Sequence, residues 1–256
     1  MLTAFVARPS RNISACQLTH VARIPIILDR IRAQHAEYCR LLTELGANVL
    51  ILEPNEDFPD SVFVEDTAVV LDEVAILCSM GTESRRGESK SIACVLRGYR
   101  RMESIKLPAS IEGGDVLKVG NKLLVGESTR TNLEGIKALA GIAGNYGYET
   151  ISIPVHGSLH LKTACTALPD GRLLINPEWL DARALSGFAL LPVPKTEPWA
   201  ANLLLVRDTV CASAANADTI ELIQHQGFKV HPIDISEFAK AEGGLTCLSL
   251  LIETTS

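Results

Sequence analysis

The chain has 256 residues, of which 47% are hydrophobic, and a formal net charge of -6 at pH 7. Its lysines and arginines are scattered and form no basic stripe, which argues against nucleic acid as a partner. No apolar stretch approaches membrane length, and the N-terminus, which meets Arg8 early, does not resemble a signal peptide. The seven cysteines include no CxxC pair and no disulfide-like spacing, which is typical of proteins in a reducing compartment. We therefore expect a cytoplasmic protein with a small-molecule substrate, no nucleic acid and no membrane association.

The first elements set a pattern. Residues 3–8, Thr-Ala-Phe-Val-Ala-Arg, predict a strand. A helix is then predicted by apolar residues at helical spacing, namely Ile31, Tyr38, Leu41, Leu42 and Leu45. Gly46 follows at once, where a left-handed helix cap is favoured. Residues 47–54, which end in proline, predict the next strand.

This pattern recurs along the chain. Five glycines spaced about 40 to 50 residues apart each precede a short strand-like stretch that ends near a proline; they are Gly46, Gly98, Gly147, Gly187 and Gly227. Each stretch is followed by a polar loop and a second apolar segment, such as 62–71 or 159–168. Turns at 120–121 and 169–171 join such segments to a further strand and predict hairpins.

The repeating unit is therefore a strand, a hairpin and a helix, present about five times. The opening strand is expected to complete the last module. Radial repetition removes exposed sheet edges and brings equivalent positions to one axis, so we predict a propeller-like α/β ring. Because no linker divides the sequence, residues 1–256 are expected to form a single catalytic domain.

Chemically useful side chains cluster at the junctions between the loops and the second segments. In chain order they are Asp60, Glu65 and Asp66, then Glu112, Gly113, Gly114 and Asp115, then His160 and Lys162, then Asn202, and finally Cys247. Taken alone, Cys247 would be a core residue, because unpaired cysteines are usually buried. A ring, however, would bring all these junctions into one pocket.

The pocket composition indicates a reaction. A thiol acts as a nucleophile in its thiolate form, and His160 is the available cationic partner for Cys247. Several carboxylates beside the thiol disfavour an anionic substrate but suit a guanidinium group.

Two arginines suggest the other end of the substrate. Arg85 and Arg130 each lie just before a predicted helix, and Thr131 with Glu134 forms a capping-box pattern. An arginine at a helix N-terminus is a favourable site for a carboxylate. A guanidinium at one end and a carboxylate at the other describe an arginine derivative.

Several ordered motifs, spread over nearly the whole chain, resemble those of the dimethylarginine dimethylaminohydrolase family. They are Phe-Pro-Asp-Ser-Val-Phe-Val-Glu-Asp-Thr-Ala (58–68), Ser-Arg-Arg-Gly-Glu (84–88), Ile-Glu-Gly-Gly-Asp-Val-Leu (111–117), Ser-Thr-Arg-Thr-Asn (128–132), Leu-His-Leu-Lys-Thr-Ala-Cys-Thr (159–166) and Gly-Gly-Leu-Thr-Cys (243–247). The resemblance implies a five-bladed, pseudo-symmetric α/β propeller, the pentein fold, built from ββαβ modules. It also implies an enzyme without cofactor or metal, with a homodimer as an assembly to test.

The resemblance further implies that Cys247 attacks the guanidinium carbon of dimethylarginine or monomethylarginine. His160, oriented by Glu112, would protonate the departing amine, and water would then release citrulline from a covalent thiouronium. The substrate-binding residues would be Leu18 on a lid loop, Asp60 for the amino-acid part, Glu65 and Asp66 for the guanidinium, and Arg85 and Arg130 for the α-carboxylate. The choice of Arg85 over its neighbour Arg86 rests on the resemblance alone.

Two alternatives remain open at the sequence level. An arginine deiminase-like enzyme uses a related thiol, histidine and acid, so plain arginine or another guanidine is the second substrate candidate. The same propeller also occurs in a ribosome-binding initiation factor, so a non-catalytic binding module is the candidate from another class.

Overall fold

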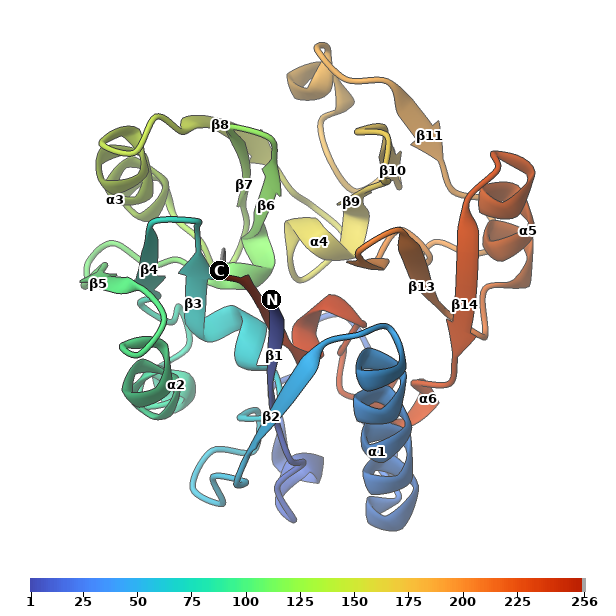
Figure 1. The fold of residues 1–256 in the computed structure, drawn as a ribbon, viewed down its shortest axis with the longest axis horizontal. Coiled ribbons are helices and arrows are strands. Elements are labelled where there is room, and N and C mark those ends of the chain that lie inside the picture. Colours follow the sequence, from blue (N-terminus) through green and yellow to red (C-terminus); the bar gives the residue numbers. More distant parts are fainter. Residues whose placement is uncertain (255–256) are drawn as a thin grey trace.

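The structure, a computed structural model, describes residues 1–254. Five three-stranded sheets surround a common axis (Figure 1). In each sheet an antiparallel pair is extended by a third strand that runs parallel to the middle one. The predicted ring of five modules is confirmed; four are ββαβ, and in the fourth a 3-10 turn replaces the helix.

The modules follow one another along the chain. The first contains β15 (Leu250–Glu253), β1 (Leu2–Ala7), α1 (Leu28–Glu44) and β2 (Asn48–Leu52). The second contains β3 (Ala68–Val70), β4 (Val74–Leu77), α2 (Ser89–Leu96) and β5 (Arg101–Ser104), and the third β6 (Val116–Val119), β7 (Lys122–Glu127), α3 (Leu133–Gly144) and β8 (Glu149–Pro154). The fourth contains β9 (Cys165–Ala167), β10 (Leu173–Ile175), the 3-10 turn η5 (Ala182–Leu185) and β11 (Leu190–Pro192). The fifth contains β12 (Leu204–Val206), β13 (Thr209–Ser213), α5 (Ala217–His225) and β14 (Lys229–Ile233), and α6 (Ser236–Ala239) follows.

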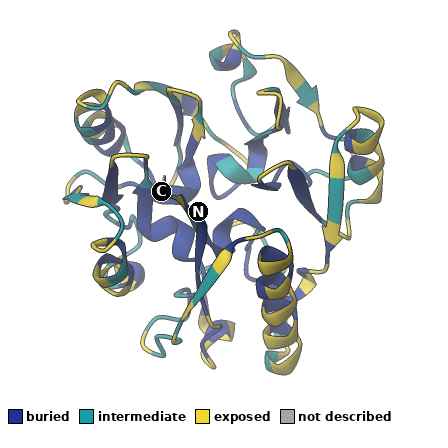
Figure 2. Ribbon diagram, in the orientation of Figure 1, coloured by how far each residue is buried: buried dark blue, intermediate teal, exposed yellow. Residues whose placement is uncertain are grey.

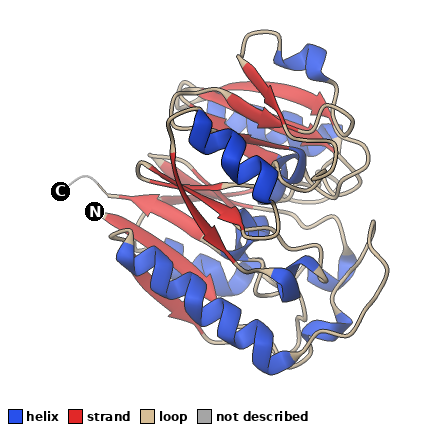
Figure 3. Cartoon of the chain, turned by 90° about the vertical axis from the view of Figure 1, so that its right-hand side faces the viewer, coloured by secondary structure: helices blue, strands red, loops and turns tan. Residues whose placement is uncertain are grey.

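The two ends of the chain close the ring, as predicted. β1 pairs antiparallel with β15, and the Thr254 amide donates to the Met1 carbonyl at 2.9 Å. Figure 3 accordingly shows both termini on the same side of the molecule. Every helix within residues 1–254 is too short or too polar to span a lipid bilayer.

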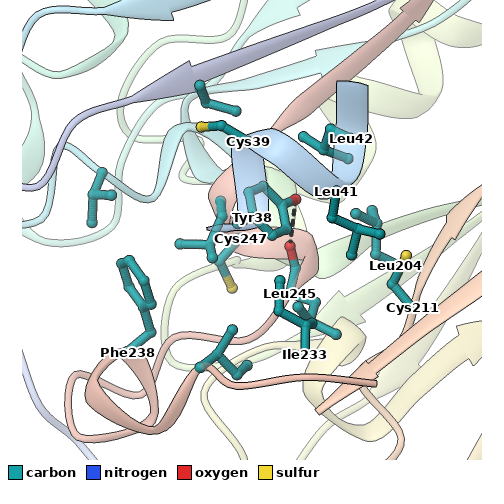
Figure 4. Packing of buried hydrophobic residues seen from close by; sticks show 14 of the residues in the cluster. Tyr38, Cys39, Leu41, Leu42, Leu204, Cys211, Ile233, Phe238, Leu245 and Cys247 are labelled. Carbon is teal, nitrogen blue, oxygen red and sulfur yellow. Dashed lines mark hydrogen bonds between the residues drawn. The ribbon is translucent and has the colours of Figure 1, made fainter. Parts of the chain in front are cut away.

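Burial follows the position of each strand in its module. The middle strands are almost wholly buried, whereas the parallel outer strands β2, β5, β8, β11 and β14 are mostly exposed or half-buried (Figure 2). The first module packs α1 against the segment that carries Cys247. There the Tyr38 hydroxyl donates to the Leu245 carbonyl at 3.0 Å and lies 2.8 Å from Ser249 Oγ (Figure 4). Since Tyr38 is fully buried, this contact fixes the main chain just before Cys247.

The second apolar segments differ from the expectation in their first halves. Instead of continuous strands, three of them (62–71, 159–168 and 245–252) begin with one short helical turn, and only their second half pairs in the sheet. Thr163, predicted on a strand, lies in the helical turn α4 (Leu161–Ala164), and β9 starts at Cys165. Side chains from neighbouring modules bind the amides of these turns, which alternation within one segment could not show.

The predicted glycine caps hold in three modules. Gly46, Gly147 and Gly227 have φ of 84°, 84° and 87°, the left-handed conformation that suits glycine. Gly98 and Gly187 have no positive φ, and the elements before them end without this cap.

The predicted capping box at Thr131 and Glu134 is wrong by one residue. Helix α3 starts at Leu133, and the Asn132 carboxamide oxygen accepts from the Gly135 amide at 2.8 Å. The same oxygen accepts from the Ser110 amide, whereas Thr131 Oγ1 accepts from the Glu112 amide at 3.2 Å. Asn132 therefore caps the helix and also ties it to the preceding segment.

Candidate active site

Short helical turns from four modules meet at the centre of the ring. They are η2 (Val64–Thr67), η4 (Gly113–Asp115), α4 and η6 (Thr246–Leu248). Turn η2 contacts both η4 and η6, and α4 contacts η4. These turns carry or directly follow most of the side chains that the sequence placed at module junctions, Asp60 and Asn202 excepted, so the predicted convergence is seen.

Polar side chains link each turn to a neighbour. Asp66 Oδ1 accepts from the Gly114 amide at 3.2 Å, and Asp115 Oδ1 accepts from the Leu161 amide at 2.9 Å. In the same way, Asn202 Oδ1 accepts from the Thr246 amide at 3.2 Å. Each bond satisfies an amide at the start of a turn, as an N-cap does in a helix.

A small cavity lies where the turns meet. Six of the nine predicted site residues line it, namely Asp60, Asp66, Arg85, Arg130, His160 and Cys247. Gln17, Phe63, Leu159 and residues 241–243 complete the wall. Its free volume is about 10 Å³, close to that of one water molecule. An arginine-sized molecule can enter only if part of the wall moves.

Glu112 lies directly behind the cavity and holds His160. Its Oε2 is 2.8 Å from His160 Nε2, and both side chains are buried. Its Oε1 accepts from the Gly81 amide at 3.1 Å. On the other side of the imidazole, Asp66 Oδ1 lies 3.8 Å from Nδ1. The ring is therefore fixed between two carboxylates.

These carboxylates decide the charge of His160. Burial alone would lower its pKa, but Asp66, Asp115 and Glu112 outweigh this effect and raise the pKa to about 9. In Glu112 and Asp66 burial opposes ionisation, yet His160 and Arg85 hold both carboxyl pKa values below their usual range. At neutral pH the structure therefore contains an imidazolium next to ionised carboxylates.

Cys247, in contrast to His160, is held in its uncharged form. Burial, followed by the charges of Glu65 and Asp66, raises the pKa of its thiol to about 12. The Gly244 amide donates to Sγ at 3.4 Å and weakly opposes this shift. In the absence of substrate the thiol is therefore neutral at pH 7.

The structure distinguishes Arg85 from Arg86. Arg85 is buried and donates from Nη1 to Asp66 Oδ2 at 2.8 Å, and from Nη2 to Glu88 Oε2 at 2.8 Å. Arg86 is exposed to solvent. Arg130 is also buried, and its Nη1 donates to Thr82 Oγ1 and lies 3.6 Å from Glu112 Oε1. Both buried guanidinium groups keep further N–H groups for an anion.

Asp60 connects the cavity to residues 16–27, a loop that we call the lid loop. Both of its carboxylate oxygens accept from the Gln17 amide, at 3.1 and 3.2 Å. Leu18 follows on this loop and is half-buried, but its neighbour Gln17 lines the cavity instead. Burial raises the pKa of Asp60, although Arg85 opposes the shift.

Glu65 is turned away from the cavity. Its Oε1 is 2.5 Å from Lys162 Nζ, and its Oε2 accepts from Thr246 Oγ1 at 2.7 Å. Glu65 and Lys162 line a separate hollow of about 190 Å³. Direct contact between Glu65 and a bound guanidinium would require this ion pair to rearrange.

The glycine pair before Asp115 allows the turns to approach closely. A Cβ on Gly114 would lie 2.6 Å from His160 Nδ1 and 2.7 Å from Asp66 Oδ1. A Cβ on Gly113 would lie 2.0 Å from the Glu65 carbonyl oxygen. A side chain on Gly114 would displace the groups that surround His160, and one on Gly113 would push η4 away from the main chain of η2.

Sequence reasoning assigned no role to two buried carboxylates. Glu88 binds Arg85 three residues earlier, and burial raises the pKa of Glu88 to about 7 despite Arg85. Its position in the Ser-Arg-Arg-Gly-Glu motif was the available signal. Glu242 also lines the cavity and binds the lid loop. Its partners lie more than 200 residues away, so no local pattern pointed to it.

Asp66, Glu112 and His160 form the one cluster in residues 1–254 whose ligand atoms could meet at a metal ion. Their geometry suits internal ion pairs instead. The two carboxylates face opposite ring nitrogens, and Arg85 Nη1 lies 2.8 Å from Asp66 and 3.7 Å from Glu112. A guanidinium therefore supplies the positive charge between these carboxylates.

Known proteins resemble this chain in both fold and sequence. The chain is 37% identical over 248 residues to N(G),N(G)-dimethylarginine dimethylaminohydrolase of Streptomyces coelicolor, covering 96% of this chain and 95% of that protein. The enzyme of the same name from Pseudomonas aeruginosa is 36% identical over 219 residues, with 85% and 86% covered. A solved mutant of the Pseudomonas aeruginosa protein in complex with citrulline superimposes with a TM-score of 0.91 at 31% identity, covering 98% of this chain and all of that one.

The fold and the site define an α/β propeller enzyme of the guanidino-group-modifying class. The family model described as N,N dimethylarginine dimethylhydrolase, eukaryotic, matches residues 9–182. The chain belongs to the dimethylarginine dimethylaminohydrolase family, and it is a hydrolase.

Proposed function

We propose that this chain converts Nω,Nω-dimethyl-L-arginine, and the Nω-monomethyl form, to L-citrulline and the corresponding amine. The observation that carries the proposal is a single cavity lined by a buried thiol, a cationic histidine, three buried carboxylates and two buried arginines. The names of its relatives and the citrulline bound in a structural neighbour support the same substrate class.

Substrate binding follows from charge. Arg85 and Arg130 would take the α-carboxylate, Asp60 and the main chain at Leu18 would hold the amino-acid part, and Asp66 would face the guanidinium. Glu65, which we expected to bind the guanidinium as well, would act through its negative charge behind Cys247, because Lys162 and Thr246 occupy its oxygens.

The reaction would proceed in two balanced halves. Cys247 releases its proton to solvent as the cationic substrate binds, and its sulfur attacks the guanidinium carbon. His160 donates its proton to the departing nitrogen, so the C–N bond breaks, dimethylamine leaves and a thiouronium stays on Cys247. The neutral imidazole then takes a proton from water, and the resulting hydroxide adds to the same carbon. The C–S bond breaks with its electron pair on sulfur, the proton of the added hydroxyl group passes to the thiolate, and citrulline is released with the neutral thiol restored. Glu112 holds the ring through both halves, and no metal or cofactor is required by this scheme.

The proposal is tested by measuring citrulline formation from asymmetric dimethylarginine, monomethylarginine and arginine, with Cys247→Ser alongside. We expect the methylated substrates to react fastest and the variant to be inactive. Preference for arginine would preserve the mechanism and change the substrate. Absence of citrulline from all three would contradict the proposed activity and favour a binding function.

We also propose a cytoplasmic location and one catalytic domain over residues 1–256. All seven cysteines are free, which suits a reducing compartment. A homodimer remains a prediction, which analytical ultracentrifugation can check.

A further inference from the structure

Glu242 joins the lid loop to the wall of the cavity. It follows α6, has a φ of 58°, and its side chain is buried. Its Oε1 accepts main-chain N–H bonds from three consecutive lid residues, Thr19 at 2.9 Å, His20, and Val21 at 2.7 Å. Three amides that converge on one carboxylate oxygen form an anion-binding nest made from the lid itself.

These three bonds are the whole hydrogen bonding of this carboxylate within residues 1–254. Glu242 Oε2 is buried and has no hydrogen-bond partner there. An ionised carboxylate removed from water is unfavourable unless it is well hydrogen-bonded, so its stability in this position depends on the lid. The left-handed backbone of Glu242 is an added strain that a long side chain rarely adopts without such contacts.

A second carboxylate fixes the lid on the other side of Leu18. Asp60 binds the amide of Gln17, and Glu242 binds the amides from Thr19 onward, so Leu18 lies between two anchored points. Asp60 binds the lid and is also a proposed substrate ligand, whereas the hydrogen bonds of Glu242 are made to the lid loop. The position of Leu18 is thus set by one carboxylate on each side.

The lid must open for substrate to enter, because the closed cavity holds only about 10 Å³. Glu242 also lines a neighbouring pocket of about 250 Å³, together with Val21 and Gly243. This pocket provides space beside the carboxylate into which the lid and the Glu242 side chain can move. The bond between them is therefore located where opening would take place.

We propose that Glu242 is a positioning residue that holds the lid loop closed over bound substrate. It acts through the main chain at 19–21 and not on the reacting atoms. The kinetic part of this inference rests on the proposed function, whereas the contact between Glu242 and the lid does not.

Hydrogen exchange tests the contact without any substrate. In Glu242→Asn, whose residue tolerates the left-handed conformation but carries a shorter, uncharged side chain, the amides of residues 19–21 should exchange about tenfold faster. Glu242→Gln, which retains the length, should give a smaller increase in the same amides. The matched control is Glu56→Gln, because Glu56 accepts from the Arg11 amide at 2.9 Å outside the lid. Unchanged exchange at 19–21 in both Glu242 variants would overturn the proposal, whatever the activity.

Steady-state kinetics test the positioning role. We expect kcat/KM of Glu242→Asn to fall about tenfold, mainly through a higher KM, with the pH profile of kcat unchanged. Glu56→Gln should behave like the wild type. Faster exchange at 19–21 combined with a wild-type KM would overturn the positioning role. If the wild-type protein hydrolyses neither arginine nor its methylated forms, the proposed function fails. Hydrogen exchange then remains the test of the contact between Glu242 and the lid loop.

Discussion

Cys247 and His160 lie in one cavity, where His160 is ready to donate a proton but the thiol is held in an unreactive protonation state. The thiol is neutral because burial and the charges of Glu65 and Asp66 raise its pKa to about 12, while nearby carboxylates keep His160 protonated. A guanidinium placed against Cys247 would add the missing positive charge and lower the thiol pKa. The substrate itself would then complete the nucleophile, which protects the free thiol from adventitious chemistry.

The first prediction concerns thiolate formation. At pH 7 the free protein should show no thiolate absorbance from Cys247, and a non-reactive cationic ligand should produce it. The difference spectrum between wild type and Cys247→Ser, recorded with and without ligand, measures this directly. A thiolate already present in the free protein at neutral pH would contradict the electrostatic account.

The second prediction concerns Glu112. Glu112→Gln removes a carboxylate that helps to raise the pKa of His160, so that pKa should fall. Because His160 must be protonated to act as the acid, activity is lost as the pH rises through its pKa, near 9 in the wild type. The variant should lose activity at lower pH, and its kcat should drop by about 10²- to 10⁴-fold. A pH profile of kcat with an unmoved alkaline limb would show that Glu112 does not control His160.

At the scale of elements, the site depends on short turns capped by side chains from another module. Asp66, Asp115 and Asn202 each accept from an amide at the start of such a turn. The sequence pattern placed Asn202 among the junction residues but gave it no specific role. In the structure Asn202 cross-links α4 and η6, because its Nδ2 also donates to the Lys162 carbonyl at 2.9 Å and to Thr246 Oγ1 at 3.0 Å.

The third prediction tests this cross-link between α4 and η6. Asn202→Ala leaves the buried Thr246 amide without its partner, which should lower the free energy of unfolding by about 1–3 kcal/mol and reduce kcat by displacing Cys247. Asn176→Ala is the matched control, since Asn176 is equally buried, donates to the Pro198 carbonyl and accepts from the Glu178 amide. Urea unfolding and kcat should show a stability loss in both variants and a catalytic loss in Asn202→Ala alone. Equal kcat values for Asn202→Ala and Asn176→Ala would show that the cross-link made by Asn202 does not position Cys247.

The local elements were predictable where local chemistry decides them. Glycines followed by strand and proline located the outer strands β2, β5, β8, β11 and β14, and apolar spacing located α1. The helical turns were missed because they depend on caps from other modules, such as Asp66 on Gly114. The orientation of Glu65 was missed for the same reason, since Lys162 lies about a hundred residues further along the chain.

At the scale of the whole molecule, ring closure makes the modules dependent on one another. The first module is incomplete without β15 from the other end of the chain, and side chains from different modules meet around Cys247. The repeat in the sequence was sufficient to predict this ring and the convergence of its junctions. It could not predict that the lid loop closes the cavity, because that closure depends on contacts over more than 200 residues.

The fourth prediction is that residues 1–256 unfold as one cooperative unit. Trp179 and Trp199, whose ring centroids are 4.6 Å apart, report on the region around the fourth module, and buried Cys39 reports on the first. Tryptophan fluorescence and alkylation of Cys39 should give the same urea midpoint. Two separate midpoints would indicate modules or domains that unfold independently.

The central claim is that Cys247 bonds covalently to the guanidinium carbon of a methylated arginine. The most direct measurement is mass spectrometry of protein that has been mixed with asymmetric dimethylarginine and quenched with acid within the first turnovers. The account predicts a mass increase equal to the substrate minus dimethylamine, confined to the peptide that contains Cys247 and absent from Cys247→Ser. Citrulline formation by the wild type without any such adduct, or an adduct on another cysteine, would contradict it.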